Sequence, residues 1–379
     1  MKDGFIKAAS ASPVIKVADT EYNAQRVIET IKAADEMGVK MLVFPELVLT
    51  GCTCYDLTGH NVVLRGAKKA LLEVIAASEG VDMLVFVGLP IAVGSRLYSC
   101  AAAIYDGELL GLVPRENVRG TQFAEPADSY VEVEIDAEHV AVLSTDYVFT
   151  CAALPDLKVA AELGADIDVL VPPSVRHAQA GATVIAQLAS FPETVTSADE
   201  AELTLRSQSR RLHCGMIMAA PGKGESTTDN VFSGLCMIAE NGEILAASEC
   251  ENSMAVTELD VEYIVNTRRG SDDFDLDSDE YYEAVWGGEP VETELTRSYR
   301  KYPHLPANEA DMPAYCERML DIQVSGLVKR MQYAGLDHCV VGISGGVDST
   351  LAVMVSAMAV RKLGLPSTNV VACTMPCFG

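Results

Sequence analysis

The sequence predicts an α/β protein built from two parts, and three observations lead to this prediction. Short apolar runs typical of strands alternate with longer runs of helical spacing over residues 1–260, a pattern typical of layered α/β folds. A strand, a glycine-rich turn and a helix follow one another at 339–363, as in nucleotide-binding parallel sheets. Between them, over 261–306, the pattern weakens and the acidic run 271–283 occurs, so we expect a linker there.

The elements of the first part follow from apolar periodicity, which is two residues in strands and about 3.6 in helices. We expect strands at 5–9, 40–44, 82–89, 139–143, 167–171, 183–189 and 215–220, and helices at 20–37, 61–77, 175–180 and 203–213. Two hairpins are expected, 97–113 with its turn at Asp106-Gly107 and 232–249 with its turn at Asn241-Gly242. The run 157–163 fits either a helix end or a short buried strand.

The second part, 307–379, is predicted to begin with a long helix at 313–333 and to continue with a buried strand at 339–343, a helix at 351–363 and a strand at 369–374. A nucleotide-binding sheet on this plan needs further strands. We therefore expect residues 307–379 to be a fragment of such a domain, and we expect no ATP chemistry from this chain alone.

The turn after the strand at 339–343 has the composition of an anion site. Its members are Ser344, Gly345, Gly346, Asp348 and Ser349. Glycines allow backbone N–H groups to approach phosphate oxygens, and the start of a helix favours negative charge. A carboxylate at Asp348, beside bound phosphates, indicates a metal ion that neutralises both.

Charge and composition exclude several classes of protein. The chain has 379 residues and a formal net charge of −26, which disfavours binding to nucleic acid. We find no run long enough to span a membrane and no signal peptide. The eleven cysteines follow no disulfide or zinc spacing, so we expect reduced thiols and a cytoplasmic protein. The acidic positions Asp275, Asp277 and Asp279 imitate a calcium loop, but Glu280 and Trp286 occupy positions that such a loop cannot tolerate.

Two sets of motifs resemble known families. The string from Ser344 to Ser349 resembles the pyrophosphate loop of the N-type ATP pyrophosphatases, and Phe44-Pro45-Glu46-Leu47 with Gly51 resembles the nitrilase or carbon-nitrogen hydrolase superfamily. This order of domains is similar to that of the glutamine-dependent NAD+ synthetases. The resemblance implies a four-layer αββα sandwich at 1–260, then the start of a synthetase domain. It also implies ATP and Mg²⁺ as cofactors, Asp348 as a metal ligand, and a homo-oligomer acting on deamido-NAD+ with glutamine or ammonia.

The same resemblance implies a Glu-Lys-Cys triad, and this chain departs from it twice. Glu46 stands at the position of the general base. Val113-Pro114-Arg115 replaces the family's lysine with an arginine, which keeps the charge but not the shape or the proton transfer. The run from Glu162 to Asp166 matches the string around the nucleophile and places Gly164 there. Under this alignment the run 157–163 is a strand.

A second alignment places Ser144 at the nucleophile, but no Pro-Pro-Ser string follows it at the family's distance. Ser144 would also need a histidine aimed by a carboxylate. Cys151 precedes the matched position, and we expect it to be a buried structural thiol. A glycine at 164 cannot form a thioester.

The family's arginine for the glutamine carboxylate is also missing, because the sequence has Phe191-Pro192 and then Ser197 in that region. The loop 116–125 lacks the family's tyrosines. We therefore expect a glutaminase half that has lost its thiol chemistry, and a synthetase that uses free ammonia or a separate glutaminase. Two alternatives remain: a non-catalytic scaffold that assembles the oligomer, and an amidase of other specificity that works through Ser144.

Overall fold

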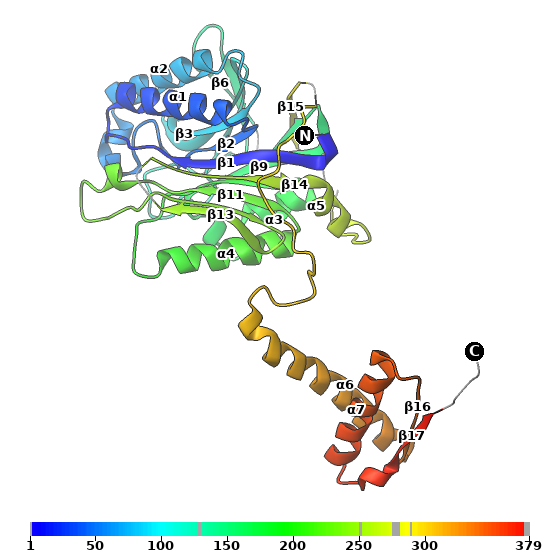
Figure 1. Ribbon diagram of the computed structural model, residues 1–379. Coiled ribbons are helices and arrows are strands. Elements are labelled where there is room, and N and C mark those ends of the chain that lie inside the picture. Colours follow the sequence, from blue (N-terminus) through cyan, green and yellow to red (C-terminus); the bar gives the residue numbers. More distant parts are fainter. Residues whose placement is uncertain (1, 128–129, 250–251, 275–280, 289, 375–379) are drawn as a thin grey trace. The chain divides into compact units, whose positions relative to one another are not determined.

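The computed structural model describes the chain except for residues 1, 128–129, 250–251, 275–280, 289 and 375–379. The chain forms two compact units, Met1–Arg297 and Ser298–Gly379 (Figure 1). Each unit is considered by itself below.

Unit 1 contains two mixed sheets over its described residues. The first sheet has the strand order β14-β1-β2-β3-β4-β5-β7-β6, and the second has the order β13-β12-β11-β10-β9-β8-β15. The strands of the first sheet are β1 (Phe5–Ser12), β2 (Met41–Val43), β3 (Leu84–Val93), β4 (Arg96–Tyr105), β5 (Glu108–Pro114), β6 (Val131–Glu134), β7 (Val140–Leu143) and β14 (Ser253–Asp260). Those of the second are β8 (Tyr147–Cys151), β9 (Leu154–Leu163), β10 (Val184–Leu188), β11 (Gly215–Ala219), β12 (Leu235–Glu240), β13 (Glu243–Glu249) and β15 (Tyr282–Trp286).

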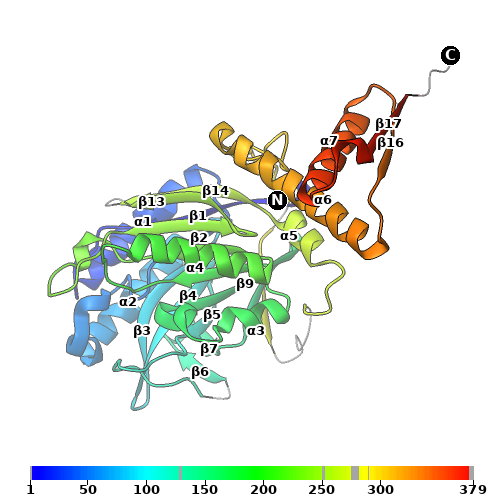
Figure 2. The same cartoon turned by 90° about the horizontal axis from the view of Figure 1, so that it is seen from below.

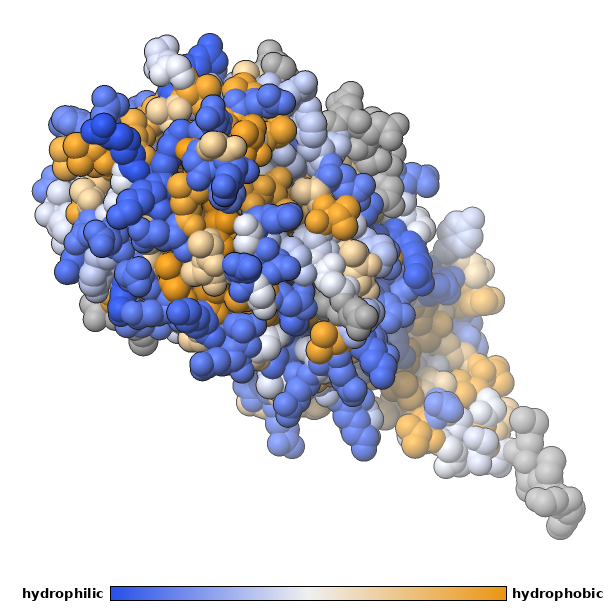
Figure 3. All heavy atoms as spheres, turned by 90° about the horizontal axis from the view of Figure 1, so that it is seen from above, coloured by the Kyte–Doolittle hydropathy of each residue, from blue (hydrophilic) through white to orange (hydrophobic). Residues whose placement is uncertain are grey.

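Helices cover the outer face of each sheet (Figures 1 and 2). Helices α1 (Thr20–Glu36) and α2 (Asn61–Ala77) pack on the first sheet, and α3 (Pro173–Gln179) and α4 (Ser197–Leu212) pack on the second. Helix α5 (Val261–Arg268) follows β14. Polar side chains cover most of the face that carries α1 and α2, with apolar atoms between them (Figure 3). The four-layer αββα sandwich predicted for the first part is therefore confirmed.

The alternation of side chains along each strand explains why the layers stack. In β1, Ile6 and Ala8 lie in the core between the two sheets, whereas Ala9 and Ala11 lie in the core beneath α1 and α2. Neighbouring residues of a strand point to opposite faces, so one strand contributes to both cores. A sheet buried on both faces needs nearly continuous apolar runs, and Leu84–Val93 is such a run.

The structure corrects several sequence expectations. Strands β6, β8, β14 and β15 were not predicted. Residues 167–171 do not form the expected strand: β9 ends in a short 3₁₀ turn, Gly164–Asp168, and Leu170 and Val171 lie exposed. Helix α4 begins at Ser197, earlier than expected, because its acidic first turn favours a helix start.

The range 261–306, predicted to be an acidic linker, contains α5 and β15, which belong to unit 1. Strand β15 pairs in parallel with β8, and its Trp286 Nε1 donates a hydrogen bond of 3.1 Å to the carbonyl of Phe149. Strand β15 lies at the edge of the second sheet, and alternate residues of it, including Glu283, face solvent. This polar pattern explains why the segment was predicted to be a linker. The calcium-like positions Asp275, Asp277 and Asp279 lie outside the described residues.

Unit 2 has a strand–helix–strand arrangement preceded by a long helix. Helix α6 (Met312–Ala334) leads to β16 (Cys339–Ile343), and α7 (Val347–Lys362) connects β16 to the parallel strand β17 (Val370–Thr374). A small core lies between the helices and strands. Throughout the part of the chain that the structure describes, no helix combines the length and apolar character needed to cross a membrane.

We predict that Trp286→Ala destabilises unit 1 by about 3–5 kcal/mol, because it empties a side-chain volume that is 2% exposed in the core between the sheets. Val285→Ala on the same strand is the matched control, since Val285 is 60% exposed. Urea unfolding followed by circular dichroism measures both variants. Equal midpoints for the two variants would contradict the assignment of β15 to the fold.

Candidate functional site

Glu46 lies in the turn that follows β2, and its side chain is 1% exposed. The turn packs so closely on β3 that a Cβ atom at Gly88 would lie 2.4 Å from the backbone nitrogen of Leu47. Ser99 Oγ donates a hydrogen bond of 2.6 Å to Glu46 Oε1, and the backbone N–H of Glu46 donates to the carbonyl of Ala189. The first sheet therefore holds the carboxylate, and Ala189, which directly follows β10 of the second sheet, holds the backbone of Glu46.

Arg115 follows directly on β5 and forms an ion pair with Glu46. Its Nη1 lies 3.3 Å from Glu46 Oε1 and 3.2 Å from Oε2, and its Nε donates to the carbonyl of Asn117 at 2.8 Å. The two side chains are 11% and 1% exposed. A pair so shielded from solvent is tightly coupled, because removing either partner leaves an uncompensated buried charge.

Gly164 directly follows β9 and faces this ion pair. Its φ is +53°, and a Cβ atom built on it would lie 2.5 Å from Arg115 Nη1 and 2.5 Å from Glu46 Oε2. Gln187 Nε2 donates a hydrogen bond of 2.9 Å to the carbonyl of Gly164. The structure thus brings together Glu46, Arg115 and Gly164, the three residues predicted from the sequence. The guanidinium and the carboxylate fill the space that a side chain at position 164 would need.

Two buried acids hold the turn at the end of β9. Asp166 accepts hydrogen bonds from the backbone N–H groups of Leu163, Glu116 and Asn117, and burial raises its pKa to about 6. Glu162 accepts one from the backbone N–H of Ser174, and burial raises its pKa to about 8. Both acids therefore tie the turn to neighbouring segments.

The two alternative nucleophiles lie elsewhere. Ser144 Oγ accepts a hydrogen bond from the N–H of Asp146, and within the described residues none of its hydrogen bonds reaches a histidine. Cys151 lies in the core between the sheets, where burial raises the pKa of its thiol. Neither residue lines the cavity beside Glu46.

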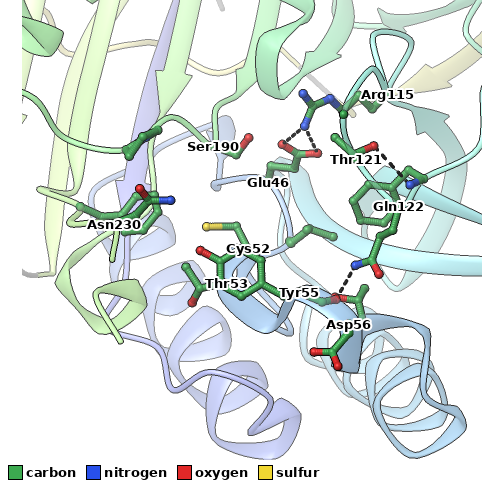
Figure 4. Close-up of a pocket in the computed structure, with 16 residues that line it drawn as sticks. Glu46, Cys52, Thr53, Tyr55, Asp56, Arg115, Thr121, Gln122, Ser190 and Asn230 are labelled. Atoms are coloured by element: carbon green, nitrogen blue, oxygen red, sulfur yellow. Dashed lines mark hydrogen bonds and ion pairs between the residues drawn. The ribbon is translucent and has the colours of Figure 1, made fainter. Parts of the chain in front are cut away.

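A cavity of about 410 Å³ adjoins the ion pair (Figure 4). Four connecting segments form it, and its lining residues include Glu46, Cys52, Tyr55, Asp56, Arg115, Gln122, Phe123, Ser190, Asn230 and Phe232. Gly164 is not among the lining residues. The ion pair therefore separates the turn at Gly164 from an open space that a small molecule could enter.

The cavity holds one thiol that the sequence analysis missed, that of Cys52. Its backbone N–H donates to Glu225 Oε1 at 2.8 Å. Burial raises the pKa of the thiol well above its usual value, and the carboxylates of Glu225 and Glu46 raise it further. Since the thiolate is the nucleophile, this environment suppresses the reactivity of Cys52. Its position directly after Thr50-Gly51, in the segment that follows Glu46, was the signal available in the sequence.

The sequence has Ser197 in the region where the family's arginine for the glutamine carboxylate is expected. Ser197 lies away from this cavity. Its Oγ donates to Glu193 Oε1 at 2.8 Å, and it lines a neighbouring cavity of about 250 Å³. Pro192 lines both cavities.

In unit 2, the predicted phosphate loop connects β16 to α7. Gly345 has a φ of +85°, Gly346 precedes the first turn of α7, and Asp348 lies in that turn. The N–H of Gly346 donates to Ser344 Oγ at 3.3 Å, and Ser349 Oγ donates to the carbonyl of Gly346 at 3.1 Å. The residues fit an anion at a helix start. Over the described ranges, no group of three or more metal-ligating side chains is present.

We predict that a side chain at position 164 is excluded chiefly by Arg115. Gly164→Ala should destabilise unit 1 more than Gly38→Ala, because Gly38 also has a positive φ, of +73°, but has no neighbour within 4 Å of a built Cβ atom. The free energy of unfolding should fall by about 1–3 kcal/mol more for Gly164→Ala than for Gly38→Ala. In an Arg115→Lys background the excess should shrink, since the guanidinium is gone.

A double-mutant cycle by urea unfolding measures this coupling between positions 115 and 164. The steric account would be contradicted if the free-energy changes of Gly164→Ala and Arg115→Lys were additive. It would also be contradicted if Gly164→Ala destabilised unit 1 no more than Gly38→Ala does.

Comparisons with known proteins support the two-part organisation. The sequence model of the carbon-nitrogen hydrolase family matches residues 7–269, and that of NAD synthase matches residues 319–378. The glutamine-dependent NAD(+) synthetase of Mycobacterium tuberculosis is 31% identical over 394 aligned residues, covering 99% of this chain and 58% of that protein. The one from Thermotoga maritima is 24% identical and covers 96% and 59%. The chain thus spans less than two thirds of the length of these relatives.

Solved structures show the same fold. The glutamine-dependent NAD(+) synthetase from Cytophaga hutchinsonii has a TM-score of 0.60 at 17% identity, covering 94% of this chain and 52% of that one. The enzyme from Acinetobacter baumannii, in complex with ADP, has a TM-score of 0.56 at 18% identity, covering 98% and 60%. Saccharomyces cerevisiae Nit3, a nitrilase-superfamily protein, has a TM-score of 0.55 at 15% identity, covering 71% and 95%.

The resemblance inferred from the motifs is therefore confirmed. The chain belongs to the carbon-nitrogen hydrolase family, and its two parts together are similar to glutamine-dependent NAD(+) synthetases.

Proposed function

We propose that the protein acts in NAD+ biosynthesis, in the amidation of deamido-NAD+, and that its glutaminase-type unit no longer hydrolyses glutamine. Unit 1 corresponds to the glutaminase half and unit 2 to the start of the synthetase half. The nitrogen then comes from free ammonia or from a separate glutaminase, in the cytoplasm. The family matches over both parts of the chain support the pathway.

The observation that carries the loss of glutamine hydrolysis is the packing at Gly164. A thioester needs a sulfur atom on the residue that faces Glu46. Here that residue has no side chain, and a Cβ atom would already lie 2.5 Å from the Glu46 carboxylate. Glu46 itself is paired with Arg115 at 3.2 Å and has no nucleophilic side chain opposite it at position 164.

The remaining groups of the cavity do not restore the reaction. Burial, and after it the carboxylates of Glu225 and Glu46, raise the pKa of the Cys52 thiol and keep it protonated. Arg115 keeps its proton and its charge is matched by Glu46, so it offers little net stabilisation to a developing oxyanion.

In unit 2, the loop of Ser344, Gly345, Gly346 and Ser349 would hold the pyrophosphate part of ATP, with backbone N–H groups and hydroxyls as donors. Asp348 would contribute a carboxylate to a Mg²⁺ ion. Mg²⁺ binds through one or two carboxylates together with substrate phosphates, so a lone protein carboxylate at this position fits its chemistry. When bound, ATP would supply the adenylyl group that activates the nicotinate carboxylate of deamido-NAD+, with release of pyrophosphate, before ammonia displaces AMP.

We predict that the purified chain releases no glutamate from glutamine above the level of its Glu46→Ala variant. A coupled glutamate assay measures both proteins under the same conditions. Glutamate release by the wild-type protein that disappears in Glu46→Ala would contradict the proposal. Exposed Glu21→Ala on α1 serves as the control for a carboxylate substitution away from the cavity.

A further inference from the structure

The cavity beside Glu46 has an unusual charge balance for a site that would accept an amino acid. Arg115 is the one basic residue among the described residues that line it, whereas Glu46 and Asp56 are both acidic. The charge of Arg115 is matched by Glu46 at 3.2 Å. Asp56, exposed at the rim next to Tyr55, then leaves the lining with a net negative charge (Figure 4).

The surroundings of Cys52 also disfavour negative charge in this cavity. Glu225 lies behind the cavity wall, where its carboxylate accepts hydrogen bonds from the N–H groups of Cys52 and Thr53. Burial is the largest cause of the raised pKa of the Cys52 thiol, and the charges of Glu225 and Glu46 raise it further, so negative charge is disfavoured at this point of the cavity. A ligand carboxylate placed there would meet the same field.

The rest of the lining suits a cation with a polar end. Tyr55, Phe123 and Phe232 contribute aromatic side chains, whose ring faces attract ammonium groups. Gln122 and Asn230 contribute amide groups that can donate to and accept from an uncharged amide. The volume of about 410 Å³ admits a small molecule of a few carbon atoms.

We infer that this cavity is a binding site for small cationic amines that carry an amide or another uncharged polar group, and that it rejects carboxylates. The ammonium group lies toward Asp56 and Tyr55, and the uncharged end lies toward Asn230, which stands on the other side of the cavity from Asp56 and Gln122 (Figure 4). Binding involves no covalent step. This inference goes beyond the proposed function, because it concerns which ligand the cavity holds rather than whether it hydrolyses one.

Three probes of equal length and graded charge test the inference by isothermal titration calorimetry. Glutaminamide carries one positive charge, glutamine is zwitterionic, and glutaramate carries one negative charge, while all three share the side-chain amide. We expect glutaminamide to bind about tenfold more tightly than glutamine, glutaramate not to bind, and the preference to weaken at high salt.

Asp56→Asn should weaken the binding of glutaminamide about three- to tenfold. Asp35→Asn, on the exposed face of α1, should leave the binding affinity unchanged. The inference is overturned if glutamine or glutaramate binds as tightly as glutaminamide, if none of the three binds at about 10 mM, or if the two aspartate variants behave alike. Calorimetry reads binding without turnover. Failure of the proposed function would instead show as glutamate release, so the two failures are distinguishable.

Discussion

The ion pair between Glu46 and Arg115 is the interaction on which the chemistry of unit 1 depends. In most carboxylate–guanidinium pairs the partners lie at a surface and contribute little. Here both side chains are almost fully buried, the carboxylate also accepts from Ser99, and the guanidinium also donates to Asn117. The pair occupies the space in front of Gly164. We propose that a carboxylate paired in this way, facing a residue without a side chain, does not act as a general base.

The fold explains how the three positions come to meet. Glu46 follows β2 and Arg115 follows β5, both strands of the first sheet, while Gly164 follows β9 of the second. Their strands face each other across the core between the sheets, which is lined by apolar residues from both. The site is therefore built at the end of the sandwich, where turns from both sheets converge. The residues at 115 and 164 fit one another sterically, since the guanidinium occupies space beside Gly164 that a side chain there would need.

Much of this arrangement could be predicted from the sequence, because buried strands such as those around Leu42 and Val85 are continuous apolar runs, and because the motif around Glu46 is specific. Strand β15 was missed because an edge strand with alternate exposed residues resembles an acidic linker. Residues 167–171 were wrongly predicted as a strand because apolar residues are not always buried, as the exposed Leu170 shows. Cys52 was missed because no local pattern reveals that Glu225, far along the chain, lies beside it.

The central claim is that none of the thiols in the described part of unit 1 is activated toward an amide. It is tested most directly by mass spectrometry of the intact chain after incubation with an electrophilic glutamine analogue. The account predicts no adduct on Cys52 or Cys151 at neutral pH, because both thiols have raised pKa values. A stoichiometric adduct on either cysteine that forms rapidly, and that is lost when Glu46 is replaced by alanine, would contradict it.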